Sequence, residues 1–261
     1  IFQGIKVLSR SNVLLLLAAS MASIATLTLG GYPVDAGLVT VTALYLFSMH
    51  TMNRCMSFEA DRFNEPNRAH FYEKYRGRLL AASGVAGGLS LALGLAWGPS
   101  VVAGLAAGIA LGVFYSLRLE PRTLKGGRVM KFPASKSLVV IGGWTVSLAV
   151  IPVLAYSELA GAGWIIGLVF AFGMALLRFG IIELRDIQGD RIVGKRTLPI
   201  AFGKSQTEDL LWVVCAALGV MLVAGVVNGW VGQGIGLAML APVALAGLGI
   251  WLYQRKIIGH S

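Results

Sequence analysis

Long apolar runs recur along the chain, separated by short turn-forming clusters and by longer charged segments. Residues 101–113 and 213–227 are continuously apolar, whereas strands of a transmembrane β-barrel alternate in polarity at every second residue. A helix needs roughly 20 apolar residues to cross the hydrocarbon core of a bilayer. The pattern therefore predicts an all-α protein, a polytopic transmembrane helical bundle.

We expect eight membrane spans, and short clusters that contain glycine or proline divide several of them. Such short connections make the flanking helices antiparallel neighbours. We expect residues 1–261 to form a single transmembrane domain. The predicted spans are residues 12–30, 34–60, 79–97, 99–117, 134–156, 161–187, 209–228 and 232–253.

Composition agrees with a membrane protein. Of the 261 residues, 56% are hydrophobic and only 13% are charged, so polar side chains are too few to cover the surface of a soluble protein. Cys55 and Cys215 stand far apart, without the spacing of a zinc site or a disulfide framework. Lipid is therefore the expected solvent for most of the chain.

The 22 lysines and arginines lie in segments that eight spans place on one side of the membrane. The opposite turns carry only Asp35 and Glu158 as charges. The positive-inside rule predicts that the charged loops and both termini are cytoplasmic, in a cell inner or plasma membrane. The cations precede the first span, follow the last, and occur six at a time in residues 54–78, 118–136 and 178–204.

Two polar clusters extend back into predicted helix ends, where charge is costly and usually functional. In the first cluster, Asn53, Ser57 and Asp61 recur at every fourth residue, which predicts one helical face. The second cluster consists of Glu183, Asp186 and Asp190, again at helical spacing. We expect both clusters to open toward the same water layer.

Hard oxygen ligands ringed by arginine and lysine suit Mg²⁺ bound to a polyphosphate. A simpler interpretation makes these carboxylates an interfacial charge network that only pairs with Arg54, Arg62, Arg185 and Arg191. A further alternative is a transporter or lipid-binding protein that uses the carboxylates as an ion site.

The first cluster resembles a motif of the UbiA superfamily of intramembrane prenyltransferases. That motif reads Asn-x3-Asp-x3-Asp and continues Arg-x-Asn-x-Pro-x-Arg, and the residues that match it are Asn53, Asp61, Arg62, Asn64, Pro66 and Arg68. The second cluster resembles the family's second motif, Asp-x2-Gly-Asp-Arg-x2-Gly-Lys-Arg-Thr-Leu-Pro, through Asp186, Gly189, Asp190, Arg191, Gly194, Lys195, Arg196, Thr197, Leu198 and Pro199. The segment 114–116 leading to Lys125 resembles the family's loop after the fourth helix.

Three features depart from the family pattern. Ser57 replaces an aspartate, and a neutral hydroxyl is a poorer ligand for magnesium. Glu183 stands where the family usually has aspartate. The family usually has nine helices, whereas eight spans are predicted here.

The resemblance implies a Mg²⁺-dependent enzyme that moves an isoprenyl group from a prenyl diphosphate to an aromatic or other lipophilic acceptor. Its partners would be the donor, the acceptor and membrane lipids, and no nucleic acid. The alternative within the same fold is phosphoribosyl transfer or terpene cyclisation. The implied metal ligands are Asn53, Asp61, Glu183, Asp186 and Asp190, of which Asp61, Asp186 and Asp190 are also catalytic together with Tyr115.

We expect several polar side chains to bind the substrate, chiefly its diphosphate. Aromatic faces at a similar depth, including Phe114, Trp144 and Phe179 besides Tyr115, are candidates for stabilising an allylic cation. The predicted substrate-binding residues are Asn53, Ser57, Asn64, Arg68, Lys125, Lys131, Lys195 and Arg196.

Overall fold

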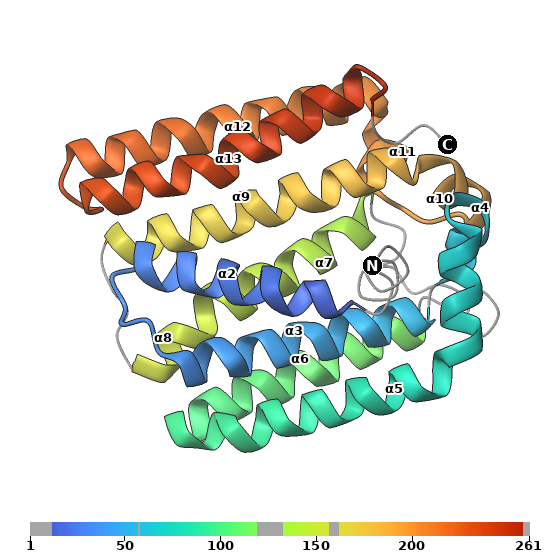
Figure 1. Cartoon of the computed structure of the whole chain (residues 1–261), viewed down its shortest axis with the longest axis horizontal. Helices are drawn as coiled ribbons and strands as arrows, with labels where there is room; N and C mark the ends of the chain where they lie inside the picture. The colour runs from blue at the N-terminus through green and yellow to red at the C-terminus, as the bar shows by residue number, and fades with distance from the viewer. Residues whose placement is uncertain (1–11, 57, 119–132, 157–161, 258–261) are drawn as a thin grey trace, which may run out of the picture. The chain divides into compact units, whose positions relative to one another are not determined.

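The computed structural model describes residues 12–56, 58–118, 133–156 and 162–257, and within these ranges it contains helices and turns but no strand (Figure 1). The long helices are α2 (Val13–Leu29), α3 (Ala36–Met56), α5 (Pro66–Gly94), α6 (Pro99–Arg118), α9 (Ala162–Arg185), α12 (Lys204–Val227) and α13 (Gln233–Gln254). The shorter ones are η1 (Phe58–Ala60), α4 (Asp61–Asn64), η2 (Leu95–Trp97), α7 (Ser135–Thr145), η4 (Val146–Val150), α8 (Ile151–Tyr156), α10 (Ile187–Val193) and α11 (Leu198–Phe202).

Each of the eight predicted spans contains a helical segment, and the polytopic helical bundle is confirmed. Among the described residues, six helices are long and apolar enough to cross a membrane by length and composition. The helix α2 is apolar but has only 17 residues. The six segments are Pro66–Trp97, Pro99–Ser116, Ser135–Tyr156, Gly163–Arg185, Lys204–Val227 and Gln233–Gln254.

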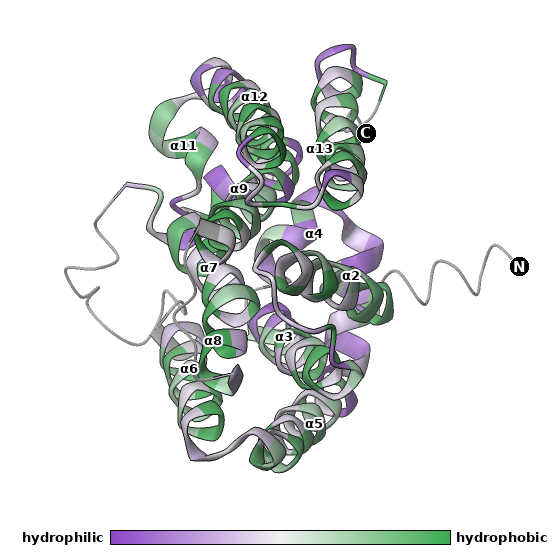
Figure 2. Ribbon diagram, turned by 90° about the vertical axis from the view of Figure 1, so that its left-hand side faces the viewer, coloured by the Kyte–Doolittle hydropathy of each residue, from purple (hydrophilic) through white to green (hydrophobic). Residues whose placement is uncertain are grey.

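Large apolar residues are exposed along these helices as well as buried between them, and the ribbons of the long helices carry much hydrophobic colouring (Figure 2). Leu17, Leu111, Val213 and Leu245 are between 64% and 69% exposed. Water would penalise such a surface at roughly 25 cal/mol per Å², whereas lipid does not. Together with the long apolar helices, this surface makes the chain an integral membrane protein.

Two helices begin earlier than predicted. The helix α5 begins at Pro66 rather than at residue 79, and α12 begins at Lys204 rather than at residue 209. Their first turns are charged, and lysine, arginine and glutamate are good helix formers although they are polar. Hydropathy therefore marked the stretch that crosses lipid, while the helix itself continues into the charged layer.

The span 135–156 is interrupted by η4, a π-helical segment between α7 and α8. Pro152 follows directly, in the first turn of α8. Proline has no N–H to donate and its ring crowds the carbonyl four residues earlier, here Leu148. A widened turn relieves this crowding, and π-helical turns are one way in which helices absorb it.

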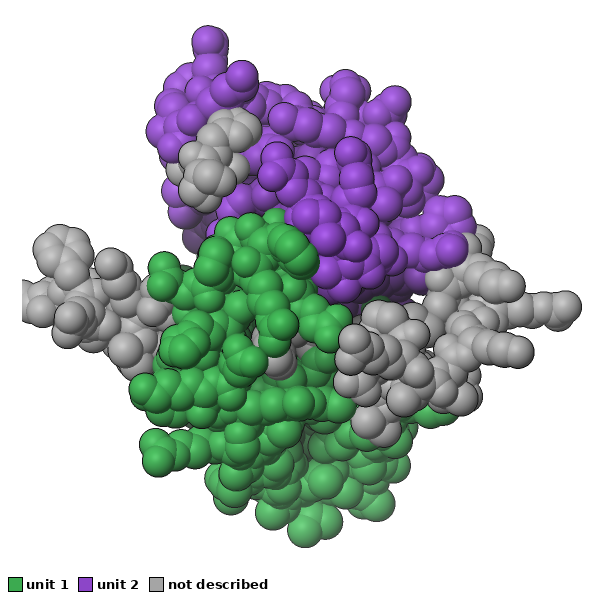
Figure 3. Space-filling view, turned by 90° about the vertical axis from the view of Figure 1, so that its right-hand side faces the viewer, with its two compact units in different colours: residues 1–24, 34–127, 146–158 green, residues 25–33, 128–145, 159–261 purple. Residues whose placement is uncertain are grey.

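The chain divides into two compact units, coloured separately in Figure 3, and each is described by itself. Unit 1 comprises residues 1–24, 34–127 and 146–158, and unit 2 comprises residues 25–33, 128–145 and 159–261. The two polar clusters belong to different units, with Asp61 in unit 1 and residues 183–190 in unit 2. The single transmembrane domain stays a prediction.

In unit 1, small and hydroxyl residues let α3 and α5 approach closely. The Ser48 hydroxyl donates to the Ser83 carbonyl, and the Ser83 hydroxyl donates to the Ser48 carbonyl, both at 2.8 Å. A Cβ added at Gly87 would lie 2.9 Å from the Ser48 Oγ. Such contacts between small residues are typical of membrane helices, where close packing and interhelical hydrogen bonds drive association.

In unit 2, α9 packs against α7, α12 and α13. Glycines on α9 make room for its neighbours, since a Cβ added at Gly180 would lie 2.5 Å from Leu211 Cδ2. The Tyr253 hydroxyl on α13 donates to the Leu184 carbonyl at 3.0 Å. This bond fixes the end of α9, where the second cluster begins.

Candidate functional site

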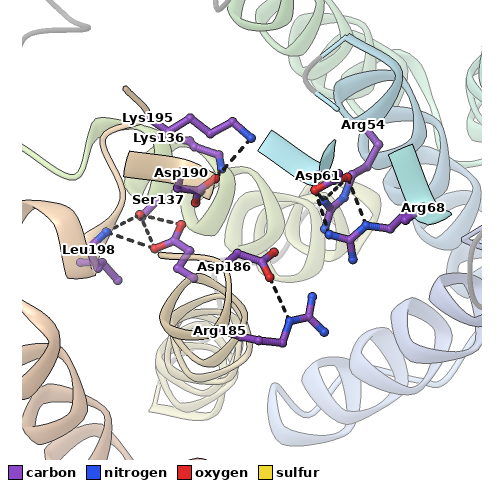
Figure 4. Close-up of polar contacts among 11 residues, drawn as sticks. Arg54, Asp61, Arg68, Lys136, Ser137, Arg185, Asp186, Asp190, Lys195 and Leu198 are labelled. Atoms are coloured by element: carbon purple, nitrogen blue, oxygen red, sulfur yellow. Dashed lines mark hydrogen bonds and ion pairs between the residues drawn. The ribbon is translucent and has the colours of Figure 1, made fainter. Parts of the chain in front are cut away.

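Asp61 is the centre of the first cluster and lies between two arginines (Figure 4). It begins α4 and is 2% exposed. Arg54 on α3 approaches with Nη1 3.3 Å from each carboxylate oxygen. Arg68 on α5 donates from Nε to Oδ2 at 3.1 Å and from Nη2 to Oδ1 at 2.8 Å. A buried carboxylate needs such partners to offset its lost hydration.

The backbone turn after α4 brings Arg68 to Asp61. Glu65 is extended, with φ −144° and ψ 78°, because the residue before a proline avoids the helical region. Pro66 then opens α5, where the fixed φ of proline suits the first helical position. With this turn between the two helices, the guanidinium of Arg68 reaches the carboxylate of Asp61 at the start of α4.

The predicted span 34–60 is too long as one α-helix, because α3 ends at Met56 and η1 and α4 follow. The common helical face of Asn53, Ser57 and Asp61 stays a prediction, since Ser57 lies outside the described residues. Asp61 begins α4, where its buried carboxylate meets arginines from α3 and α5. Asn53 on α3 and Asn64 at the end of α4 are half-buried.

Asp190 is the centre of the second cluster and also lies between two cations (Figure 4). It is on α10 and is 3% exposed. Lys136 at the start of α7 places Nζ 3.7 Å from Oδ2, and Lys195 places Nζ 3.4 Å from Oδ1. The Lys195 N–H also donates to the Asp190 carbonyl at 2.9 Å.

A left-handed glycine allows Lys195 to return to Asp190. Gly194 ends α10 with φ +75°, a conformation that glycine adopts without steric cost. The chain reverses there, so that Lys195 lies against the helix it has just left. The Gly-Lys pair in this motif therefore has a direct structural reason.

Asp186 lies at the junction between α9 and α10, with φ −92° and ψ 9°. Its N–H donates to the Ile182 carbonyl at 3.0 Å, and the Asp190 N–H donates to the Asp186 carbonyl at 3.1 Å, so helical bonding continues across the junction. Asp186 is 6% exposed, and its Oδ1 accepts a hydrogen bond from Arg185 Nε at 2.9 Å. The predicted helical spacing from Glu183 to Asp190 is thus largely kept.

Glu183, on the last turn of α9, contacts neutral donors. The Ser137 hydroxyl lies 2.8 Å from Oε1 and 2.7 Å from Oε2. The Leu198 N–H, at the start of α11, donates to Oε2 at 3.1 Å and also approaches Ser137 Oγ at 3.1 Å. Its role as a metal ligand stays a prediction.

Arg178 occupies an aromatic site within the membrane-spanning part of α9. Its guanidinium carbon lies 4.6 Å from the centre of the Trp144 ring and 5.1 Å from that of Phe179. The two rings meet edge to face, with centroids 5.7 Å apart. These faces, predicted as candidates for stabilising an allylic cation, therefore already hold a protein cation.

The remaining predicted residues divide into two groups. Tyr115 is half-buried near the end of α6, and Arg196 is exposed in the connection before α11. Ser57, Lys125 and Lys131 lie outside the described residues.

Four residues that make the contacts described above are not among the predicted metal or substrate ligands: Arg54, Lys136, Ser137 and Arg178. Arg54 and Lys136 carry the charge expected near a diphosphate, so charge alone could have marked them. Arg178 interrupts an otherwise apolar span, which is a recognised signal of function. Ser137 gave no signal, because a serine in an apolar helix is common.

The described residues contain no group of three or more His, Cys, Asp and Glu side chains able to hold a metal ion. Magnesium usually takes one or two carboxylates from a protein and completes its shell with phosphate oxygens and water. Asp61 and Asp190, each a single buried carboxylate, therefore fit a magnesium ion that arrives with a diphosphate. Paired cations around each aspartate fit the remaining phosphate charge.

The charge network that the simpler interpretation requires is present in part. Arg54 pairs with Asp61 and Arg185 pairs with Asp186. Arg62, however, pairs with Glu73 on the surface, where both side chains are more than half exposed. Pairing of this kind is also what a buried carboxylate awaiting a metal would need.

Comparison with known proteins gives one match. The sequence profile described as the UbiA prenyltransferase family matches residues 12–260, nearly the whole chain. Neither a curated protein nor a solved structure matches. The matched residues include both polar clusters and every helix from α2 to α13, so the chain belongs to the UbiA prenyltransferase family.

Proposed function

We propose that this protein is a magnesium-dependent membrane prenyltransferase, which moves an isoprenyl group from a prenyl diphosphate to an aromatic or other lipophilic acceptor. Family membership supports the reaction class. The observation that carries the proposal is the common design of the two clusters. Asp61 and Asp190 are each buried between two cations that come from different segments of the chain.

This design suits a substrate that brings its own counterion. In the free protein the cations neutralise the aspartates. Asp61 and Asp190 would hold the metal of a magnesium diphosphate, and the cations that now pair with these aspartates would then pair with phosphate oxygens. Each aspartate has two cations in contact, and these cations are the groups proposed to pair with phosphate oxygens, although Arg68 also pairs with Glu65. Asp186 and Asn53 are the proposed additional ligands, and the bound metal would supply Lewis-acid stabilisation of the diphosphate.

The chain's own side chains then stabilise the leaving group. The allylic carbon–oxygen bond breaks with its electron pair going to the diphosphate, which gains negative charge. Fixed cations close to these oxygens lower the barrier because they interact more strongly with the leaving group than with the substrate. The proposed residues are Arg68, Lys195 and Arg196 among the described ones, together with Lys125 and Lys131.

The other fragment is an allylic cation that water would quench. The acceptor attacks it, forms the new carbon–carbon or carbon–oxygen bond, and loses a proton to the medium. We propose that Tyr115 faces this cation and that the apolar helices exclude water from it. Ser57, Asn53 and Asn64 are proposed to contact the diphosphate as neutral hydrogen-bonding groups.

The test is a transfer assay with purified protein in nanodiscs. Radiolabelled prenyl diphosphates of several lengths are incubated with aromatic, quinone-precursor and glycerol-phosphate acceptors, with magnesium or with excess EDTA. Magnesium-dependent formation of a labelled lipophilic product is the expected result. Without transfer from any prenyl diphosphate, the proposal is wrong.

The same assay separates the alternatives. A labelled product that forms without an acceptor indicates terpene cyclisation. Transfer from a phosphorylated ribose donor indicates a phosphoribosyltransferase of the same fold. A Lys74→Gln variant controls for the loss of a cation outside the two clusters, because Lys74 is an exposed cation of α5 that contacts the Tyr75 ring.

A further inference from the structure

We infer that Glu183 is a positioning residue of the second cluster, which it holds in place through Ser137 and the backbone of Leu198. The inference rests on the proposed function and changes the role that the motif implies for this one carboxylate. The three groups, namely the Glu183 carboxylate, the Ser137 hydroxyl and the Leu198 N–H, are here called the Glu183 latch.

The contacts of Glu183 differ in kind from those of the two aspartates beside it. Asp186 and Asp190 pair with cations, which a metal ion can replace. Glu183 instead accepts from a hydroxyl at 2.7 and 2.8 Å and from a backbone N–H at 3.1 Å. Breaking these bonds would leave buried backbone and hydroxyl groups without an acceptor, which is costly.

Burial isolates the latch. Ser137 is 0% exposed, Leu198 is 4% exposed and Glu183 is 6% exposed. Hydrogen bonds to a carboxylate in such surroundings are short and strong. The latch thus has the properties of a permanent structural contact.

The latch closes the loop that carries the second cluster. Glu183 and Leu198 are 15 residues apart, and Asp186, Asp190 and Lys195 all lie between them. Closing the base of a loop removes conformations in which its side chains point elsewhere. Binding a diphosphate to the closed loop therefore costs less ordering of the chain.

The same contact sets the position of α7. Ser137 follows Lys136, whose Nζ lies 3.7 Å from Asp190 Oδ2 and whose N–H donates to the Arg196 carbonyl at 3.3 Å. Holding Ser137 against Glu183 therefore fixes where Lys136 meets the loop. One carboxylate on α9 thereby aligns α7, α10 and the start of α11.

The experiment compares Ser137→Ala, Glu183→Ala and Glu183→Gln. Amide exchange of peptides covering residues 186–198 is measured by mass spectrometry, together with magnesium-dependent binding of a non-hydrolysable prenyl diphosphate analogue. We expect Glu183→Ala to raise exchange at Leu198 roughly tenfold, the effect of losing one strong buried hydrogen bond. Ser137→Ala should raise it less, because the Leu198 N–H keeps its bond to Glu183 Oε2. Binding of the analogue should weaken in both variants. A double variant with Ser137→Ala and Glu183→Ala should bind the analogue no more weakly than Glu183→Ala alone.

Glu183→Gln tests whether residue 183 acts by accepting hydrogen bonds or by its negative charge. Its amide oxygen still accepts from Leu198 and Ser137, so we expect slow exchange and most of the analogue binding to return. If Glu183→Gln loses magnesium-dependent binding as fully as Asp190→Asn while exchange stays slow, Glu183 is a metal ligand and the inference is wrong. Unchanged exchange in Ser137→Ala would also overturn it.

Thr145→Ala is the matched control, because it removes another buried hydroxyl of α7 that bonds only to the Ile141 carbonyl of its own helix, at 2.8 Å. It should alter neither measurement. If Glu183→Ala does not fold, Ser137→Ala and Glu183→Gln still decide the question. The exchange measurement needs no substrate, so it tests the latch even if the protein transfers no prenyl group.

Discussion

Arg68 donates two parallel hydrogen bonds to the Asp61 carboxylate, from Nε to Oδ2 at 3.1 Å and from Nη2 to Oδ1 at 2.8 Å. The same guanidinium reaches Glu65 Oε2 from Nη1 at 3.1 Å. Its planar fork matches one carboxylate and would match a phosphate equally well. We therefore propose that Arg68 exchanges this internal carboxylate for a pair of diphosphate oxygens.

We predict that Arg68→Lys weakens binding of the prenyl diphosphate by about tenfold or more, because lysine keeps the charge but cannot form two parallel charge-assisted hydrogen bonds. The KM for the donor, or calorimetric titration with an analogue, measures this loss. Arg62→Lys is the control, since Arg62 pairs with Glu73 at the surface and should tolerate the change. Equal behaviour of the two variants would contradict a special role for Arg68.

We predict that Asp61→Asn and Asp190→Asn each lower magnesium-dependent transfer by roughly 100-fold, since each removes a carboxylate that the proposed mechanism assigns to the metal. Both amides are close in size to the original side chains, so helical content should change little, but the melting temperature should fall because each substitution leaves two partly buried cations without their carboxylate. Initial rates over a range of magnesium concentrations measure the effect.

The double variant tests whether the two clusters act in the same catalytic step. Groups that act as a unit are strongly non-additive, so Asp61→Asn with Asp190→Asn should be scarcely worse than either alone. Losses that multiply would show that the clusters act independently. Full activity in both single variants would show that the two clusters are a purely structural charge network.

A stability prediction concerns the close approach of α9 to the end of α2 within unit 2. A Cβ added at Gly167 would lie 3.0 Å from the Thr26 carbonyl oxygen, and backbone cannot move aside cheaply. Gly167→Ala should therefore destabilise the fold by about 1–3 kcal/mol. Gly219→Ala on α12 meets open space and should be neutral or up to about 1 kcal/mol stabilising. Thermal unfolding in detergent compares the two, and equal melting temperatures would contradict the prediction.

The orientation prediction is tested on α12 and α13 with single cysteines at exposed positions near opposite ends of the hairpin. Cys55 and Cys215 are buried and are first replaced by alanine. Because the positive-inside rule makes the charged loops cytoplasmic, Ser205→Cys should react with an impermeant maleimide only after cells are permeabilised, and Gln233→Cys should react in intact cells. The reverse labelling pattern would show that the orientation of the protein is opposite to the predicted one.

The sequence by itself determined the helical membrane architecture and the residues of the second cluster. Apolar runs such as 213–227 have no other stable state in lipid, where every backbone group must be bonded within its own helix. The segment from Asp186 to Lys195 has short-range spacing, and local helix geometry kept it. Periodicity and hydropathy are local properties, so they can be read from local sequence.

Only the tertiary structure decided which groups meet. The arginines that meet Asp61 come from two other helices, Arg54 from α3 and Arg68 from α5. Ser137 has no sequence signal, yet it meets Glu183 from 46 residues away. Such pairings follow from packing and from the need of buried carboxylates for donors, and spacing along the chain does not encode either.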